Sequence, residues 1–314
     1  MDNKVICVVG PTACGKTKMG VALAKRFGGE VVSVDSMQLY RGMTIGTAAP
    51  TPDEMEGVPH HMVAVADPAE SWSVARYVRA ADECVRDILR RGKRPVLVGG
   101  TGLYLDALVR GQDFAAGSQG GEIRKELQEK LDKNGAAALL SELQRIDPET
   151  AERLHPRDEK RIIRALEVYY ETGETISEYN RKSRTEAPRY DAAYIGLAFR
   201  DREVMKARID RRVDEMVARG LLQEVETLLQ SGLPRDATAL QAIGYKQFLA
   251  AAEGRATVEE AIEEVKLRSR QYAKRQLTWL RRNQDIHWIL WEKTPDFPAG
   301  VQNATEFLLS AGVC

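Results

Sequence analysis

The sequence predicts an α/β fold, in which a core built on a mainly parallel sheet contains an inserted helical domain. Short apolar, β-branched runs alternate with amphipathic helical stretches over residues 4–100, as in strands joined by crossover helices. A glycine-rich phosphate-binding motif stands between the first of these strands and the first helix. From about residue 122 the pattern is almost entirely helical, until one more strand-like run at residues 190–199. The helical stretch therefore interrupts the α/β core.

The first hundred residues predict a regular alternation of elements. Strands are expected at residues 4–9, 30–35 and 94–100, and helices at residues 16–27 and 71–91. Glycines end both helices, Gly28 and Gly29 after the first and Gly92 after the second. Strands that alternate with helices in this way imply a parallel sheet that is covered on both faces.

A linker and an insertion follow. Residues 110–121 are rich in glycine and small polar side chains, which is typical of a linker. Asp147 before Pro148 predicts a helix N-cap with proline at the first helical position, and Gly173 closes a helix expected at residues 158–172. We assign residues 116–189 to a helical insertion domain, and residues 1–115 and 190–314 to the core with its C-terminal helices.

The last third of the chain is again helical, with helices expected at residues 202–219, 221–230 and 258–282. Residues 266–282 contain seven basic and no acidic side chains, and Tyr272 and Trp279 are interleaved with them at helical spacing. Such a helix suits phosphate contacts and base stacking on RNA. The alternative is a solvated amphipathic helix whose tryptophan faces the core, because glutamates lie just upstream.

Composition argues against several protein classes. Lysine plus arginine and aspartate plus glutamate number 46 each, so the chain is not basic overall, although it can carry a local basic patch. None of the four cysteines forms a C-x-x-C pair, which argues against a zinc ribbon, and their small number argues against a disulfide framework. No signal peptide or membrane-spanning stretch is evident. We expect a cytoplasmic protein and, without any association signature, a monomer.

The strongest functional signal is the motif G-x-x-x-x-G-K-[ST], formed here by Gly10, Pro11, Thr12, Ala13, Cys14, Gly15, Lys16 and Thr17. Its glycines let the backbone fold around an anion, and the following helix adds partial positive charge. Lys16 would bridge two phosphates, and the Thr17 hydroxyl would ligate Mg²⁺. The flanking strand and helix disfavour a chance match, so the core is predicted to be P-loop NTPase-like. The motif recognises a diphosphate and not the group attached to it.

Asp35 follows the second strand, and ligands of open parallel sheets bind at the carboxyl ends of the strands. We therefore expect Asp35 in the same crevice as Lys16. A carboxylate there can ligate Mg²⁺ through water, accept a proton, or simply cap the next turn. Motor ATPases and GTPases need a further strand that ends in an acidic residue. Asp67 is a weak candidate and residues 94–100 end in glycines, so nucleotide hydrolysis as the primary activity is disfavoured.

Eight segments, in this order and spacing, resemble the bacterial tRNA dimethylallyltransferase family, also called tRNA isopentenyltransferases, over nearly the whole chain. They are GPTACGKT at 10–17, DSMQLYR at 35–41, GMTIGTAAP at 42–50, PHHMVAVADP at 59–68, VGGTGLY at 98–104, DEKRIIRALEVY at 158–169, QAIGYKQ at 241–247 and YAKRQLTWL at 272–280. The family transfers a dimethylallyl group from dimethylallyl diphosphate to N6 of the adenine 3′ of the anticodon, position 37, in tRNA. The resemblance implies this reaction here, with Mg²⁺ as cofactor and diphosphate as product.

The resemblance assigns catalytic roles to Lys16, Asp35, Thr101 and Arg212. An adenine amino group is a poor nucleophile, so the reaction depends on a good leaving group, and Lys16, the loop amides and Mg²⁺ supply the charge that stabilises it. Asp35 takes the N6 proton, Thr101 contacts the target nucleotide or orients Asp35, and Arg212 reaches the diphosphate. Spacing alone also allows a plain turn hydroxyl at Thr101 and a solvated helix face at Arg212.

By the same resemblance, the tRNA anticodon stem-loop is contacted from the core, the insertion and the last basic helix. The implied contacts are Asp35, Ser36, Met37, Gln38, Thr101, Arg124, Glu159, Lys160, Arg161, Ile162, Ile163, Gln241, Gly244, Tyr245, Lys246, Lys274, Arg275, Gln276, Trp279 and Arg281. Modification of a base inside RNA requires that it be pulled from its stack into a pocket.

Two residues depart from the family pattern. Cys14 stands where a small serine or alanine is usual; its backbone N–H still serves the loop, and a low-pKa thiol beside the helix end would imply no redox role by itself. Ala49 stands where lysine is common, so one positive charge near the site is missing and weaker affinity for RNA or diphosphate is expected.

Three other functions compete on the residues alone. They are prenylation of a free adenine nucleotide, nucleotide phosphorylation or ATP hydrolysis, and RNA binding without catalysis. The insertion and the basic helix argue against the free nucleotide as substrate. The intact Lys16, Thr17 and Asp35 argue against a binding module with a relict loop.

Overall fold

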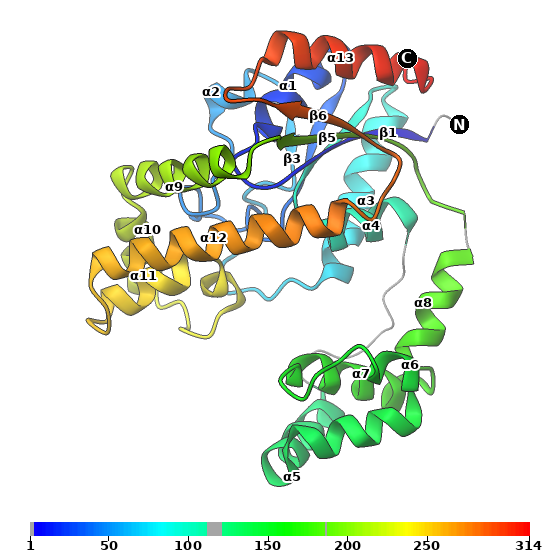
Figure 1. Ribbon diagram of the computed structural model, residues 1–314, viewed down its shortest axis with the longest axis vertical. Coiled ribbons are helices and arrows are strands. Elements are labelled where there is room, and N and C mark those ends of the chain that lie inside the picture. Colours follow the sequence, from blue (N-terminus) through cyan, green and yellow to red (C-terminus); the bar gives the residue numbers. More distant parts are fainter. Residues whose placement is uncertain (1–2, 112–120, 186) are drawn as a thin grey trace. The chain divides into compact units, whose positions relative to one another are not determined.

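The structure is a computed structural model and describes residues 3–111, 121–185 and 187–314. The chain divides into two compact units, one formed by Met1–Gly111 with Arg189–Cys314 and the other by Gln112–Pro188. The boundary predicted between residues 115 and 116 lies outside the described residues. Each unit has a hydrophobic core of its own. The first unit contains the sheet, and the second consists of helices (Figure 1).

A parallel sheet organises the first unit, and its six described strands follow the order β3-β2-β4-β1-β5-β6. The strands are β1 (Lys4–Val9), β2 (Glu30–Val34), β3 (His60–His61), β4 (Pro95–Gly99), β5 (Asp191–Phe199) and β6 (Ile286–Trp291). β2 is buried along its whole length and β1 nearly so, because helices cover both faces of a parallel sheet. The predicted α/β class with a parallel sheet is confirmed.

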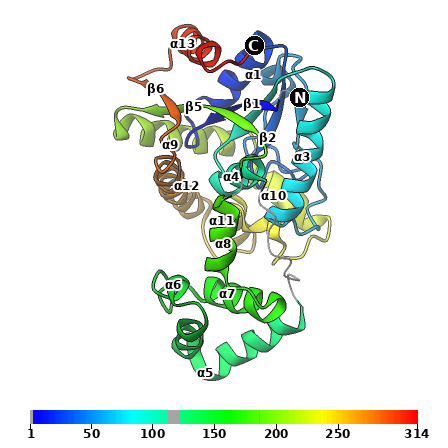
Figure 2. The same cartoon turned by 90° about the vertical axis from the view of Figure 1, so that its right-hand side faces the viewer.

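The helices of this unit are α1 (Lys16–Arg26), α2 (Pro52–Met55), α3 (Val74–Arg90), α4 (Gly102–Arg110), α9 (Arg202–Ala218), α10 (Leu221–Gln230), α11 (Tyr245–Ala252), α12 (Val258–Leu280) and α13 (Phe297–Ser310), with a 3₁₀ turn at Thr238–Gln241. The strand order reverses direction after β3, so right-handed crossovers place α1 on one face of the sheet and α3 with α4 on the other. α13 packs against α1 (Figure 2), and α12 packs against α9 and α11. No helix in the described part of the chain is long and apolar enough to cross a membrane.

Two C-terminal elements, β6 and α13, were not predicted from the sequence. β6 has the sequence Ile-His-Trp-Ile-Leu-Trp. It shows neither a strict alternation of apolar and polar residues nor an uninterrupted apolar run, so it carries no clear strand signal. The start of α13 carries a signal that could have been recognised. Asp296 accepts a hydrogen bond from the backbone N–H of Ala299 as an N-cap, and a proline follows in the first turn.

The second unit consists of α5 (Glu122–Ile146), α6 (Pro148–Ala151), α7 (Glu159–Thr172) and α8 (Ile176–Thr185). Its core contains Leu127, Leu139, Leu143, Ala151, Ile162, Ile163, Ala165 and Leu166. The predicted cap at Asp147 is confirmed, because its carboxylate accepts from the backbone N–H of Thr150 at 3.0 Å. The second oxygen accepts from the N–H of Ser177 at 3.1 Å, so one buried carboxylate joins α6 to α8.

Candidate functional site

The carboxyl ends of β1, β2 and β4 lie at one level of the sheet. Val9 of β1 and Val34 of β2 both pair with Gly99 of β4. The phosphate loop, Asp35 and Gly100 each follow one of these aligned ends. The sheet register therefore brings three segments together that are far apart in the sequence.

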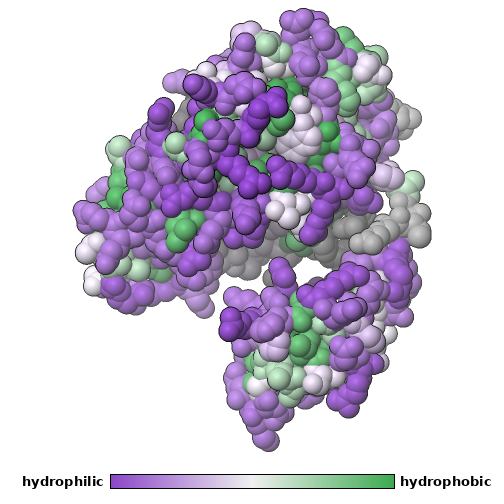
Figure 3. All heavy atoms as spheres, viewed as in Figure 1, coloured by the Kyte–Doolittle hydropathy of each residue, from purple (hydrophilic) through white to green (hydrophobic). Residues whose placement is uncertain are grey.

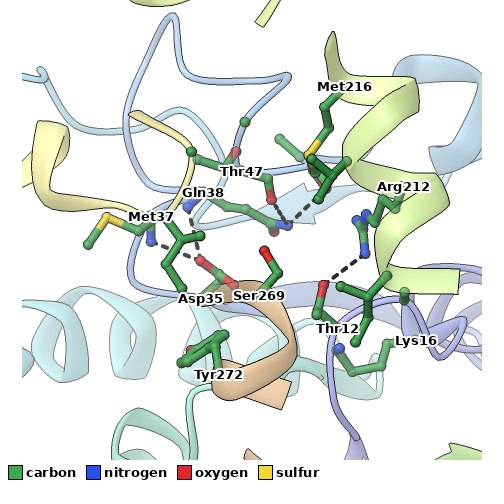
Figure 4. A pocket seen from close by; sticks show the side chains of 18 of the residues that line it. Thr12, Lys16, Asp35, Met37, Gln38, Thr47, Arg212, Met216, Ser269 and Tyr272 are labelled. Carbon is green, nitrogen blue, oxygen red and sulfur yellow. Dashed lines mark hydrogen bonds between the residues drawn. The ribbon is translucent and has the colours of Figure 1, made fainter. Parts of the chain in front are cut away.

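A pocket of about 680 Å³ opens at this edge, a volume that suits a small organic ligand. In Figure 4, Thr12 and Lys16 lie on one side of it, and Asp35, Met37 and Gln38 lie on the other. Helices α9 and α12 complete the walls with Arg212, Met216, Ser269 and Tyr272, among others. Lys16 and Asp35 thus share one crevice, as the strand order led us to expect.

Two glycines shape the phosphate loop. Gly10 has a φ of 154° and Gly15 a φ of 95°, both outside the range that side chains favour. A Cβ at Gly10 would lie 2.4 Å from the carbonyl oxygen of Leu197, and one at Gly15 would lie 2.7 Å from the ring of Phe297. The loop is therefore wedged between β5 and the start of α13, which fixes its shape before any ligand binds.

Lys16 and Arg212 form a cationic pair at the loop. Lys16 Nζ donates to the carbonyl oxygen of Pro11 at 2.7 Å, and Arg212 Nη1 donates to the hydroxyl of Thr12 at 3.2 Å. Burial lowers the pKa of the Lys16 ammonium, and the charge of Arg212 lowers it further. Burial also lowers the pKa of the Arg212 guanidinium. Two cations held against neutral oxygens favour the binding of an anion between them.

Asp35 forms the turn cap that was one of the roles considered for it. Its Oδ1 accepts hydrogen bonds from the backbone N–H groups of Met37 at 2.9 Å and Gln38 at 3.2 Å, which caps the turn after β2. The residue also lines the pocket, and its Oδ2 forms no hydrogen bond with the described residues. Capping therefore occupies one oxygen and leaves the other for a proton or a ligand.

The charge of Asp35 acts on three tyrosines, Tyr77, Tyr104 and Tyr272. Burial raises the pKa of the Tyr272 phenol, and the Asp35 charge raises it further. Burial, Tyr40 and Asp35 together raise the pKa of Tyr104 to about 12. Both phenols therefore stay neutral at physiological pH.

Thr101 is not among the residues that line the pocket. Its hydroxyl is buried and lacks a hydrogen-bond partner among the described residues, and it does not cap α4. Burial raises the pKa of neighbouring Tyr272, and the Thr101 hydroxyl opposes this rise. A local turn bond, the alternative for Thr101, is not formed. Thr101 is thus linked to the pocket through Tyr272, which lines it.

Glu224 of α10 anchors a further wall of the pocket. Its carboxylate accepts hydrogen bonds from the backbone N–H groups of Thr44, Ile45 and Gly46 at 2.8–3.1 Å. The hydroxyl of Tyr245 donates to the same carboxylate at 2.5 Å. The chain then continues into the pocket-lining residues 46–49. The loop thus depends on one acidic side chain nearly two hundred positions away in the sequence.

Replacement of Glu224 with alanine is expected to lower the free energy of unfolding by about 1–3 kcal/mol, because several backbone donors lose their acceptor. Glu224→Gln keeps an acceptor oxygen at the same reach and should lose less. Urea unfolding of both variants measures the difference. Equal stability of the alanine variant and the wild type would show that the loop is held by other contacts.

The cationic side chains implied to contact tRNA are exposed on the first unit. They are Lys246 on α11, Lys274 and Arg275 on α12, and Arg281 just after it. The face that α12 crosses is mainly hydrophilic in Figure 3. On the second unit, Glu159, Lys160 and Arg161 are exposed in the first turn of α7. Ser36, Met37, Gln38, Gln241 and Gly244 line the pocket itself.

Other implied contacts have side chains that serve the fold. Ile162, Ile163, Tyr245 and Gln276 are buried. Arg124 pairs at 3.1 Å with Glu167, whose side chain is fully buried. These side chains therefore make contacts within the protein, and Gln276 also lines the pocket.

Trp279 packs inward, as the alternative interpretation of the basic helix expects. Its Nε1 donates to Asp106 at 2.8 Å, and a Cβ at Gly102 would lie 2.1 Å from its ring. The guanidinium of Arg282 lies over the ring, 5.2 Å from its centroid. The aromatic ring is thus held between α4 and a surface arginine.

Cys14 is fully buried, and burial raises the pKa of its thiol. Its carbonyl oxygen accepts from Trp291 Nε1 at 3.0 Å, so the residue ties the loop to β6. The low-pKa thiol considered from the sequence is therefore absent, and Cys14 is not a reactive cysteine. Ala49 is also nearly buried and lines the pocket.

Arg208 was not predicted as a site residue. Its Nε donates to the carbonyl oxygen of Ala13 at 3.4 Å, and its guanidinium lies over Phe199. Residues four apart lie on one face of a helix, so the spacing of Arg208 and Arg212 could have revealed it.

Comparisons with known proteins identify relatives over the whole chain. The sequence profile described as "IPP transferase" matches residues 38–283, and that of "Isopentenyl transferase" matches residues 3–64. A tRNA dimethylallyltransferase of Geobacillus thermodenitrificans is 45% identical over 308 residues, which cover 98% of this chain and 97% of that protein.

Solved structures of similar proteins share the fold. The full-length tRNA isopentenylpyrophosphate transferase from Bacillus halodurans is 40% identical with a TM-score of 0.73, covering 99% of this chain and 98% of that one. A eukaryotic dimethylallyltransferase, solved acting on tRNA, is 33% identical with a TM-score of 0.81, covering 97% of this chain and 77% of that one.

Proposed function

The chain belongs to the IPP transferase family, and on this premise we propose that it transfers a dimethylallyl group from dimethylallyl diphosphate to N6 of adenine 37 in tRNA. The observation that carries the proposal is one pocket in which a cationic phosphate loop faces a carboxylate. Proteins similar to this chain are named tRNA dimethylallyltransferase and tRNA isopentenylpyrophosphate transferase.

The donor's diphosphate would bind at the phosphate loop, where Lys16 and Arg212 supply positive charge. In the reaction the adenine N6 forms a bond to C1 of the dimethylallyl group, and the bond from C1 to the diphosphate oxygen breaks. The diphosphate leaves with the electron pair. Preorganised cations and backbone N–H groups stabilise this developing charge. This stabilisation is the main way in which the site can lower the activation barrier.

Asp35 would accept the proton that N6 loses. Its Oδ1 stays in the turn cap, so its orientation is fixed before the substrate arrives. Thr101 would supply or receive a hydrogen bond at the adenine or, through Tyr272, help to shape the pocket that receives it. A proton acceptor raises the rate only when it is held within hydrogen-bond reach of the proton, and the turn cap provides that restraint.

The residues present fit Mg²⁺ bound together with the donor. No group of three or more His, Cys, Asp or Glu side chains that could hold a metal is found among the described residues. Mg²⁺ binds through one or two protein oxygens with phosphate oxygens and water, which suits the Thr17 hydroxyl and a water-mediated contact to Asp35. When bound, Mg²⁺ would neutralise charge on the leaving diphosphate.

The exposed basic side chains of α11 and α12 and the exposed first turn of α7 favour tRNA over a free adenine nucleotide as acceptor. A small nucleotide would need neither surface. We propose the anticodon stem-loop as the recognised part of the tRNA, a cytoplasmic location and a monomeric state.

A transfer assay tests the proposal. The protein is mixed with labelled dimethylallyl diphosphate and Mg²⁺, and the acceptor is an anticodon stem-loop, AMP or none, with ATP alone in a fourth reaction. We expect label in the stem-loop only. When EDTA is present from the start, no label should be transferred. Label in AMP alone would support the free-nucleotide enzyme, and ATP turnover without label would support a kinase or ATPase.

A further inference from the structure

The side chain of Gln276 connects two loops of the pocket. Its Oε1 accepts a hydrogen bond from the backbone N–H of Thr12 at 3.0 Å, and its Nε2 donates to the carbonyl oxygen of Gly100 at 3.1 Å. Thr12 belongs to the phosphate loop after β1. Gly100 belongs to the loop after β4, which continues into Thr101. One side chain from α12 thus bridges the donor side and the acceptor side of the pocket.

Both partners of Gln276 restrict which side chain can stand there. The N–H of Thr12 can only donate, and the carbonyl of Gly100 can only accept. A carboxylate would satisfy the first and repel the second, and an ammonium group would do the reverse. A primary amide of this length matches both, and at 6% exposure its hydrogen bonds have little competition from water.

Gly100 shows how closely the amide approaches. A Cβ built at this position would lie 2.1 Å from Gln276 Nε2. Gly100 is not among the glycines with positive φ, so its backbone conformation does not demand glycine. The same Cβ would lie 3.0 Å from the carbonyl oxygen of Gly10, so the missing side chain makes room for the glutamine amide and for the phosphate loop rather than serving the shape of the turn.

Thr12 is held from two helices at once. Gln276 of α12 binds its backbone N–H, and Arg212 of α9 binds its hydroxyl at 3.2 Å. The two preceding positions on α12, Lys274 and Arg275, are exposed. Arg275 also lines the pocket, whereas Lys274 does not.

We propose that Gln276 is a positioning residue, and not a tRNA contact, that fixes the phosphate loop against the loop of Gly99–Thr101. This inference rests on the proposed function, because it concerns the distance between the donor carbon and the acceptor nitrogen. Rigid placement of the two reactants within about 3–3.5 Å is what makes such a transfer effectively unimolecular.

Gln276→Met removes both hydrogen bonds at nearly constant volume. We expect its kcat/KM for the donor to fall by about tenfold or more, with a lower kcat, because buried donors and acceptors lose their partners. Its KM for the stem-loop should stay within about twofold of wild type, since no phosphate contact is removed. Gln276→Glu keeps only the contact with Thr12 and should also lose donor kcat/KM.

Lys274→Met is the matched control on the same helix, and we expect the opposite split: a raised KM for the stem-loop with an unchanged KM for the donor. Gly100→Ala displaces the amide without replacing Gln276, and it should reproduce the kinetic pattern expected of Gln276→Met. It therefore tests the proposal even if Gln276→Met fails to fold. A Gln276→Met enzyme with wild-type donor kinetics, or with only a raised stem-loop KM, would overturn the proposal.

A binding measurement separates this inference from the proposed function. Inorganic pyrophosphate with Mg²⁺ should raise the Tm of the wild type more than that of Gln276→Met or Gly100→Ala, whether or not prenyl transfer occurs. If the wild type transfers no label, the proposed function fails. If it transfers label and all the variants show the wild-type Tm shift and donor KM, the positioning role fails.

Discussion

Asp35→Asn is expected to bind the stem-loop and the donor normally and to transfer the dimethylallyl group about 10²–10⁴-fold more slowly, the range for loss of a positioned general base. Asparagine keeps an Oδ1 that can accept from the N–H groups of Met37 and Gln38, so the turn after β2 should persist. What it lacks is an oxygen that can take a proton from N6. The variant therefore separates the capping role of the carboxylate from its role as a base.

The measurement is single-turnover transfer of labelled donor, together with the Kd of the stem-loop. Asp35→Ala is the comparison, because it removes the cap as well as the base. We expect the alanine variant to have a lower Tm than the asparagine variant and an equally slow transfer. A wild-type rate for Asp35→Asn would leave the carboxylate as a turn cap and remove it from the mechanism.

The fold and the centre of the site could be predicted because their signals are local. Strand and helix alternate in the periodicity of the sequence, and the motif at Gly10–Thr17 carries its own strand and helix. Asp35 then follows from strand order alone, since the ends of parallel strands meet at one edge. Each of these inferences uses residues that are close together in the chain.

The hydrogen bonds that support the site join residues that are far apart in the sequence. Thr12 and Gln276 are 264 positions apart, and Cys14 and Trp291 are 277 apart. Glu224 reaches the loop at Ile45 across 179 positions. No periodicity or spacing links such pairs, because they meet only once the sheet and its helices have packed. For that reason the sequence gives no sign that Gln276 hydrogen-bonds to the phosphate loop, and its implied contact with tRNA stays a prediction.

Lys16→Met is expected to lower kcat/KM for the donor by about 10²–10³-fold, the usual effect of removing one preorganised charge from a transition state. Most substitutions lower the free energy of unfolding, but this one should leave it unchanged or raise it. Burial lowers the pKa of Lys16, so the charged ammonium is less favourable in the folded protein than in the unfolded chain. That penalty is present below the unfolded pKa, and hence at neutral pH, and methionine removes it.

We therefore expect the Tm of Lys16→Met to equal or exceed that of the wild type, while donor binding and transfer are lost. Pyrophosphate with Mg²⁺ provides the control, because it should raise the Tm of the wild type by mass action and have much less effect on the variant. A large fall in Tm for the variant would mean that the hydrogen bond from Lys16 to Pro11 stabilises the loop more than burial of the charge destabilises it. The phosphate loop would then be mainly a structural turn, and the case that the partly buried charge of Lys16 is kept for an anion would fail.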